Sequence, residues 1–142
     1  MRIARETIRL VTAEKVEFHD ITKKVKDCLA KYDIKEGILL LNSLHTTVAL
    51  FINEFQDALL HDLRLLLGRL IQERDGWRHN DPRYSDCDRH NAASHLQAMF
   101  LGRNLALGVS SVDLVLGRYQ SIIFAELDGP RERDLELQLI GE

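Results

Sequence analysis

The chain has 142 residues, of which 45% are hydrophobic and 29% are charged, and its formal net charge is −3. This length and composition predict one soluble globular domain over residues 1–142, and they exclude a disordered chain. The slightly negative charge argues against a nucleic-acid partner. No apolar run approaches the roughly 20 residues needed to cross a bilayer, and the N-terminus lacks the pattern of a signal peptide, so we expect no membrane partner.

The two cysteines, Cys28 and Cys87, belong to no Cys-x-x-Cys pair. This pattern predicts a protein of the reducing cytoplasm without a structural disulfide. Cys28 falls on the apolar face of an expected helix, and we interpret it as an inert core thiol.

The N-terminal part of the chain predicts two strands and one helix. Residues 2–11 and 15–18 have the composition and alternation of strands, and we expect them to pair as a hairpin. Asp20 or Thr22 can cap a helix that runs to about Tyr32.

The stretch from Gly37 to Glu54 carries the strongest functional signal. Its apolar runs, Ile38–Leu41 and Val48–Ile52, enclose the polar triplet His45-Thr46-Thr47. Such runs are typical of strands buried on both faces, where a polar group is costly unless it forms a hydrogen bond or ligates something. Polar residues in the most apolar part of the chain therefore predict a site.

The second half of the chain predicts two more helices and further strands. Apolar spacing indicates a helix over residues 57–72 and another over residues 92–101. The inward face of the latter is expected to consist of Leu96, Met99 and Phe100. Residues 73–91 are polar with several aromatic side chains, which favours an ordered, functional loop. Strand patterns within residues 104–140 complete an α+β architecture, mostly antiparallel sheet with about three helices.

Three histidines occupy unusual settings: His45 lies between the apolar runs, His79 in the polar loop and His95 at a helix edge. Neutral imidazoles from different elements are common ligands of zinc and related metals, and three of them with an open fourth position describe a catalytic site. Their spacing matches no short metal motif, and hydrogen bonds to backbone carbonyls explain each histidine separately. Spacing alone leaves both interpretations open.

Other polar residues add candidate chemistry. Glu54 and Glu126 lie at or within apolar strands, so each is expected to pair with a base or to have a shifted pKa. A Glu126 that faces solvent or pairs with Arg118 explains the pattern equally well. Arg131 and Arg133, after an Asp-Gly-Pro turn, suit capture of a carboxylate or phosphate, although a solvated turn is the commoner explanation of such a pair. Gln120, at the start of a strand, predicts a buried hydrogen-bond network.

Together these segments resemble the YjbQ family, also known as the secondary thiamine-phosphate synthase family. The matching blocks stand in family order across residues 37–141; they are His45-Thr46-Thr47, Asn53-Glu54, Arg78-His79-Asn80, Asn91–Gly102, Leu116–Gln120 and Asp128–Arg131. Two positions depart from the family pattern. Phe55–Ala58 stands where the family commonly has an Asp-Pro pair, and Tyr119 stands where it often has Trp.

The resemblance implies a mostly antiparallel β-sandwich with about three helices, assembled as a homotrimer. The site residues that it implies are His45, His79 and His95 around a divalent metal ion such as zinc, Glu54 and Gln120 as catalytic groups, and Arg131 as an anion-binding residue. The implied function is that of a metal-binding enzyme acting on a phosphorylated small molecule, with a weak thiamine-phosphate synthase activity.

That reaction joins a pyrimidine pyrophosphate to a thiazole phosphate and releases pyrophosphate. Mg²⁺ prefers oxygen ligands, whereas three histidines favour a softer metal, so a metal-dependent hydrolase fits the ligand set equally well. Three hypotheses follow: a metal-dependent enzyme, a non-catalytic trimeric module that binds a small anion or a metal, and a structural trimer whose histidines bond only to one another and to the backbone.

Overall fold

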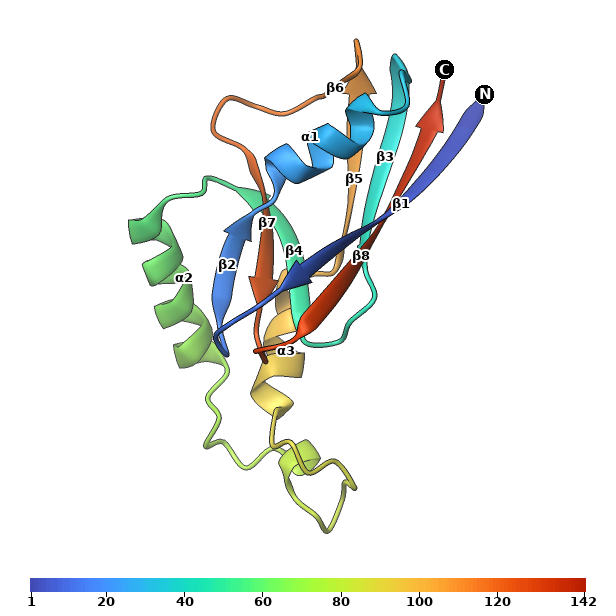
Figure 1. The fold of residues 1–142 in the computed structure, drawn as a ribbon. Coiled ribbons are helices and arrows are strands. Elements are labelled where there is room, and N and C mark those ends of the chain that lie inside the picture. Colours follow the sequence, from blue (N-terminus) through green and yellow to red (C-terminus); the bar gives the residue numbers. More distant parts are fainter.

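The computed structural model describes all 142 residues. Its elements, in chain order, are β1 (Arg2–Val11), β2 (Glu17–Asp20), α1 (Thr22–Ala30), β3 (Glu36–Ser43), β4 (Val48–Asn53), α2 (Asp57–Leu70), the 3-10 helix η1 (Arg78–Asn80), α3 (Ala92–Leu101), β5 (Asn104–Ser110), β6 (Asp113–Leu114), β7 (Ser121–Glu126) and β8 (Glu132–Gly141). The strands form a five-stranded sheet, β1-β8-β3-β5-β6, and a three-stranded sheet, β2-β7-β4 (Figure 1). All strand pairs are antiparallel, which confirms the predicted α+β architecture.

The main core lies between the two sheets. Along β4, Val48 and Leu50 point into this core, whereas Ala49 lies on the other side of the strand. There it packs with Ala98 of α3, because α3 lies against β4. Both faces of β4 are therefore covered, and this explains its continuous apolar run.

The strand β3 is buried on one face only, contrary to the prediction from its apolar run. Leu39 and Leu41 are fully buried, but Ile38 is 54% exposed and Leu40 is 39% exposed. The helices α2 and α3 lie beside the three-stranded sheet, so they leave the outer face of the five-stranded sheet uncovered (Figure 1). β3 and β4 also belong to different sheets and do not pair with each other.

The predicted N-terminal hairpin is wrong. β1 pairs with β8 along its whole length, and β2 pairs with β7. The chain crosses from one sheet to the other between Val11 and Glu17, so two strands that are adjacent in sequence enter different sheets. Alternation alone indicates a strand and not its partner.

The helix α1 begins where the sequence predicts. Asp20 Oδ1 accepts a hydrogen bond from the Thr22 amide at 3.0 Å, and Val25 and Leu29 are buried in the main core. Cys28 is half-buried beside them. Burial, together with Glu6, raises the pKa of its thiol to about 11, which accords with an inert cysteine.

The helices α2 and α3 expose apolar side chains that their sequence patterns assign to the interior. In α2 only Leu60 and Leu67 are buried, and the helix stands at the side of the three-stranded sheet (Figure 1). In α3 the buried residues include Ala98, whereas Met99 is 75% exposed and Phe100 is 64% exposed. The small alanine side chains allow α3 to lie close to β4, and this turns the larger residues outward.

Candidate functional site

Three segments meet at one end of the three-stranded sheet. In the β4–β7 pair, Val48 lies opposite Glu126, so the triplet that precedes β4 lies beside the residues that follow β7. The Leu127 amide donates to the Thr47 carbonyl at 3.2 Å. Ser94 Oγ donates to the Leu127 carbonyl at 2.7 Å and fixes the first turn of α3 at the same place.

His79 and His95 are in direct contact at this end. Their ring centroids lie 4.8 Å apart with an interplanar angle of 80°. His79 Nε2 lies 3.2 Å from Asn91 Oδ1, and Asn91 Nδ2 donates to Asp128 Oδ2 at 2.8 Å. Because the bond to Asp128 turns the amide oxygen of Asn91 toward His79, Nε2 of His79 carries the hydrogen. In the neutral form of this ring, Nδ1 of His79 therefore carries the lone pair.

His95 also keeps one free nitrogen. Burial lowers the pKa of His95, and so does the nearby His79, while a hydrogen bond to the backbone of Thr46 acts in the opposite direction. A backbone bond that raises the pKa is one in which a ring N–H donates to the carbonyl. The ring is thus neutral near pH 7, with one nitrogen occupied and the other available to a ligand.

His45 is arranged differently. Its Nε2 accepts a hydrogen bond from the Asp134 amide at 2.8 Å, so the hydrogen of the neutral ring is on Nδ1. Burial and the nearby Arg133 guanidinium hold the pKa of His45 below its ordinary value. His45 therefore presents an N–H donor where His79 and His95 present lone pairs.

The three predicted histidines thus lie at the same end of the sheet, but only His79 and His95 touch. No group of three or more His, Cys, Asp or Glu side chains is arranged to hold a metal ion. The donor set fits two imidazole ligands from this chain, and it does not fit His45 as the third.

Two guanidinium groups share one carboxylate next to the histidines. Asp128 Oδ2 accepts from Arg131 Nη2 at 3.0 Å and from Arg89 Nε at 3.3 Å. The Asp128 side chain is 9% exposed, against 32% for Arg131 and 51% for Arg89. One carboxylate cannot neutralise two arginines, so accessible positive charge remains. Arg89 lies within the polar loop, and nothing in the sequence around it predicts that it pairs with Asp128.

A buried ion pair supports the start of β4. Arg133 Nε donates to Glu126 Oε1 at 2.8 Å, and Arg133 Nη2 donates to Thr47 Oγ1 at 3.0 Å. Thr12 Oγ1 donates to Glu126 Oε1 at 2.7 Å. Burial acts to raise the pKa of Glu126, but the hydrogen bonds from Arg133, Thr12 and the Asp128 amide outweigh it and hold this pKa below its ordinary value. The base that pairs with Glu126 is therefore Arg133 and not Arg118.

Glu54 and Gln120 lie at the other end of the same strands. Asn53 is opposite Ser121, so β4 separates Glu54 from the histidines by about 20 Å at the usual rise of a strand. Both side chains are exposed, and Gln120 Oε1 accepts from the Gly117 amide at 2.7 Å. Gln120 thus forms a local turn contact and not the buried network expected from its position. Within one chain these two residues do not join the histidines.

Comparison with known proteins assigns the family. A family model described as UPF0047 protein YjbQ-like matches residues 6–142. The chain belongs to the YjbQ (UPF0047) family. It is 37% identical over 142 residues to a UPF0047 protein of Methanothermobacter thermautotrophicus, covering 100% of this chain and 95% of that protein. It is 32% identical to the UPF0047 protein YugU of Bacillus subtilis, covering 96% and 98% of the two chains.

Solved structures of YjbQ relatives share this fold. A YbjQ-like protein of unknown function from Sulfolobus solfataricus superposes with a TM-score of 0.91 at 34% identity, covering 99% of both chains. A hypothetical protein from Aeropyrum pernix gives a TM-score of 0.88 at 30% identity, covering 98% of this chain and 99% of that one. None of the helices in our YjbQ chain has the length and apolar character needed to span a membrane.

Proposed function

We propose that this YjbQ protein is an enzyme that acts on a phosphorylated small molecule. Its site is the group formed by His79, His95, Arg89, Arg131 and Asp128, which we call the histidine–arginine cluster. The observation that carries the proposal is the contact between two imidazoles, each with a free lone pair, next to an excess of guanidinium charge. Imidazole nitrogens suit metal binding or proton transfer, and arginines suit phosphate oxygens.

We further propose that His79 and His95 hold a divalent metal ion, such as zinc. Neutral imidazoles are ordinary ligands of zinc, and both free nitrogens belong to rings in contact. A bound divalent ion supplies Lewis-acid polarisation of a phosphoryl or pyrophosphoryl oxygen. In this arrangement Asn91 orients His79, and the Nδ1–H of His45 is a hydrogen-bond donor and not a ligand.

The resemblance to the YjbQ family implies thiamine-phosphate synthesis as one reaction for this cluster. Negative charge develops on the pyrophosphate as it leaves, and the guanidinium groups of Arg89 and Arg131 can stabilise this charge. Hydrolysis of a phosphate ester makes the same electrostatic demand. The cluster supports both reaction classes, and turnover of a thiamine-phosphate precursor pair against a simple phosphate ester separates them.

A non-catalytic anion-binding module is the second candidate, and the arginines favour it. Arg89 and Arg131 provide positive charge whether or not His79 and His95 hold a metal. Under this alternative, a phosphorylated ligand stays bound and is not converted, and replacing Arg131 weakens binding while replacing His79 does not.

We propose a homotrimer as the functional assembly. The apolar stripe of α2 supports self-association, because Leu59 is 38% exposed, Leu66 49% and Leu70 53% on one side of the helix. The number three comes from the family resemblance. Glu54 and Gln120 can then act as catalytic groups at a histidine–arginine cluster only from another copy of the chain. A cytoplasmic location is supported by two free cysteines.

The experiment that tests the proposal measures metal content and turnover together. Untagged protein, purified without chelators, is analysed for metals alongside the His79→Ala, His95→Ala double variant. Replacement of the exposed His61 by Ala is the matched control. We expect near-stoichiometric metal in the wild type and in the control, and loss of both metal and turnover in the double variant. Wild-type protein that takes up no zinc on reconstitution would contradict the metal assignment.

A further inference from the structure

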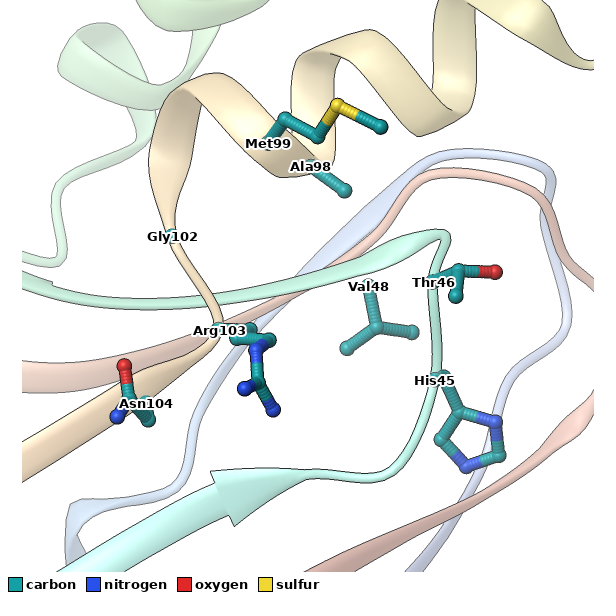
Figure 2. A pocket seen from close by; sticks show the side chains of 8 residues that line it. All are labelled: His45, Thr46, Val48, Ala98, Met99, Gly102, Arg103 and Asn104. Carbon is teal, nitrogen blue, oxygen red and sulfur yellow. The ribbon is translucent and has the colours of Figure 1, made fainter.

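A pocket lies beside His45 that is separate from the histidine–arginine cluster. Its volume is about 370 Å³, and its lining residues are His45, Thr46, Val48, Ala98, Met99, Gly102, Arg103 and Asn104. It has His45 and Thr46 in common with the neighbourhood of the cluster, but none of the cluster residues lines it. Figure 2 shows the pocket between α3, the start of β4 and the segment that leads from α3 into β5.

The lining combines one accessible apolar side chain with a polar rim that contains no acid. Met99, which is 75% exposed, supplies the apolar surface, whereas the Val48 side chain is fully buried in the main core and Ala98, on the other face of β4, is 6% exposed. Figure 2 shows the Arg103 guanidinium and the His45 ring on the same side of β4, with Val48 between them. The Asn104 side chain completes the rim. Apolar surface beside a few polar groups is typical of small-molecule sites.

Arg103 is the one charged group of the lining, and it forms no ion pair within the chain. Its only side-chain hydrogen bond is from Nη1 to Asn42 Oδ1, at 3.1 Å, so a neutral amide and not a carboxylate faces the guanidinium. The remaining N–H donors of this fork are available to a ligand. Bidentate capture of a carboxylate or phosphate is the interaction that such a free guanidinium makes best.

The backbone that carries Arg103 is held by both sheets. The Ser43 amide of β3 donates to the Arg103 carbonyl at 3.0 Å, and the Leu50 amide of β4 donates to the Gly102 carbonyl at 3.0 Å. Gly102 has φ +97°, a conformation that a side chain disfavours, so the turn that directs Arg103 to the pocket is fixed by its sequence. A site that is already ordered loses less entropy when it binds a ligand.

We propose that this pocket binds a small organic anion, with Arg103 holding the carboxylate or phosphate and Met99 contacting a short apolar body. The ligand class follows from the unpaired guanidinium, the absence of an acid from the lining and the accessible side chain of Met99. The proposal goes beyond the proposed function, because it requires neither a metal at His79 and His95 nor a reaction.

The test is an NMR titration of uniformly labelled, full-length protein, read at the amides of Gly102, Arg103 and Asn104. The probes are n-butyl phosphate and butyrate, with inorganic phosphate and butanol as partial ligands. We expect at least one of the two organic anions to bind more tightly than either partial ligand. The one that binds better identifies the headgroup.

Variants separate this pocket from the cluster. Arg103→Gln should weaken binding about tenfold, as expected for loss of a charged hydrogen bond, and Arg103→Lys should weaken it less. Arg5→Gln, which removes an exposed arginine of β1, and His79→Ala should leave binding unchanged. Any of three results would overturn the proposal: no chemical-shift changes at residues 102–104, binding of butanol as tight as that of the anions, or unchanged affinity in Arg103→Gln. If His79→Ala loses metal but still binds the anion, the metal loss concerns only the histidine–arginine cluster.

Discussion

His79 and Asn91 are joined by a hydrogen bond of 3.2 Å that determines which nitrogen of His79 is free. Asn91 is 5% exposed, and its amide group cannot rotate without losing the 2.8 Å bond to Asp128. The tautomer of His79 is therefore determined by the Asp128 carboxylate, which does not touch the ring and acts through the Asn91 amide.

Replacing Asn91 should impair metal binding without removing a ligand. In Asn91→Ala the His79 ring loses its orienting partner, and we expect affinity for zinc to fall about 10- to 100-fold, the usual effect of losing such a partner. Competition with a chromophoric chelator measures it. Asn53→Ala removes an exposed asparagine at the far end of β4 and should leave affinity unchanged. Equal affinity in Asn91→Ala and wild type would show that His79 is not oriented in this way.

Breaking the Glu126–Arg133 pair should destabilise the protein strongly. Both side chains are almost fully buried, so Glu126→Gln leaves Arg133 as an uncompensated buried charge, and we expect a loss of about 3 kcal/mol in the free energy of unfolding. Urea denaturation measures it. Lys23→Met, which breaks the exposed pair with Asp27, should change stability little. Glu126→Met with Arg133→Met should lose less than the single variant, and a larger loss would contradict the electrostatic explanation.

The same carboxylate predicts a loss of stability in acid. The pKa of Glu126 is lower in the folded state than its unfolded value of 4.5. The ionised carboxylate therefore contributes fully to the free energy of unfolding above pH 4.5, and this contribution is lost as the pH falls from 4.5 through the folded pKa. The free energy of unfolding should therefore decrease below about pH 4.5. The decrease should be smaller in the double Met variant. Identical pH profiles for the two proteins would assign the acid sensitivity to other groups.

Gly129 and Gly68 should respond to alanine in opposite directions. A Cβ on Gly129 would lie 2.3 Å from the Glu14 carbonyl oxygen and 2.9 Å from Glu126 Cγ, whereas nothing lies within 4 Å of a Cβ on Gly68. We expect Gly129→Ala to cost about 2 kcal/mol through overpacking. Gly68→Ala, within α2, should gain about 0.5–1 kcal/mol from helix propensity. Thermal unfolding compares them, and a stable Gly129→Ala would mean that the Asp128 turn can move.

Two exposed leucines that point in different directions from α2 test the proposed assembly. Leu66 belongs to the exposed apolar stripe, whereas Leu65, 45% exposed, points away from it on the helix. If the stripe is the contact between copies, Leu66→Glu should yield a monomer and Leu65→Glu should not. Light scattering coupled to size exclusion gives the mass directly. A monomeric wild type would refute the homotrimer.

The sequence predicts the elements of this fold well because local patterns determine them. The leucine spacing of α2 and the alternation of β8 each depend on residues within one segment. Partners are not local: β1 and β2 follow one another yet pair with β8 and β7. Which apolar face becomes buried also depends on other segments. The sequence therefore wrongly predicts burial of both faces of β3 and of Met99 and Phe100 in α3.

The site divides in the same way. His45 stands out because polar residues are unusual in its surroundings, whereas His79 and His95 stand out as histidines of a polar loop and of a helix edge. The fold does bring all three to one end of the sheet. The roles of their nitrogens depend on Asn91 and on the Asp134 amide, which no pattern of residue types marks. Arg89 was missed for that reason, since an arginine acquires its role from the carboxylate that it meets. Arg133 was expected to capture an anion, but it is buried and pairs with Glu126.

The most direct test of the account is the imidazole nitrogen spectrum of the protein during a zinc titration. We predict that, without zinc, His79 is the Nε2–H tautomer and His45 the Nδ1–H tautomer. Zinc should change the chemical shifts of Nδ1 of His79 and of the free nitrogen of His95 together, with saturation at one equivalent per chain. His45 should remain the Nδ1–H tautomer. Zinc shifts at His45, or none at His79 and His95, would contradict the claim that this pair forms the metal site.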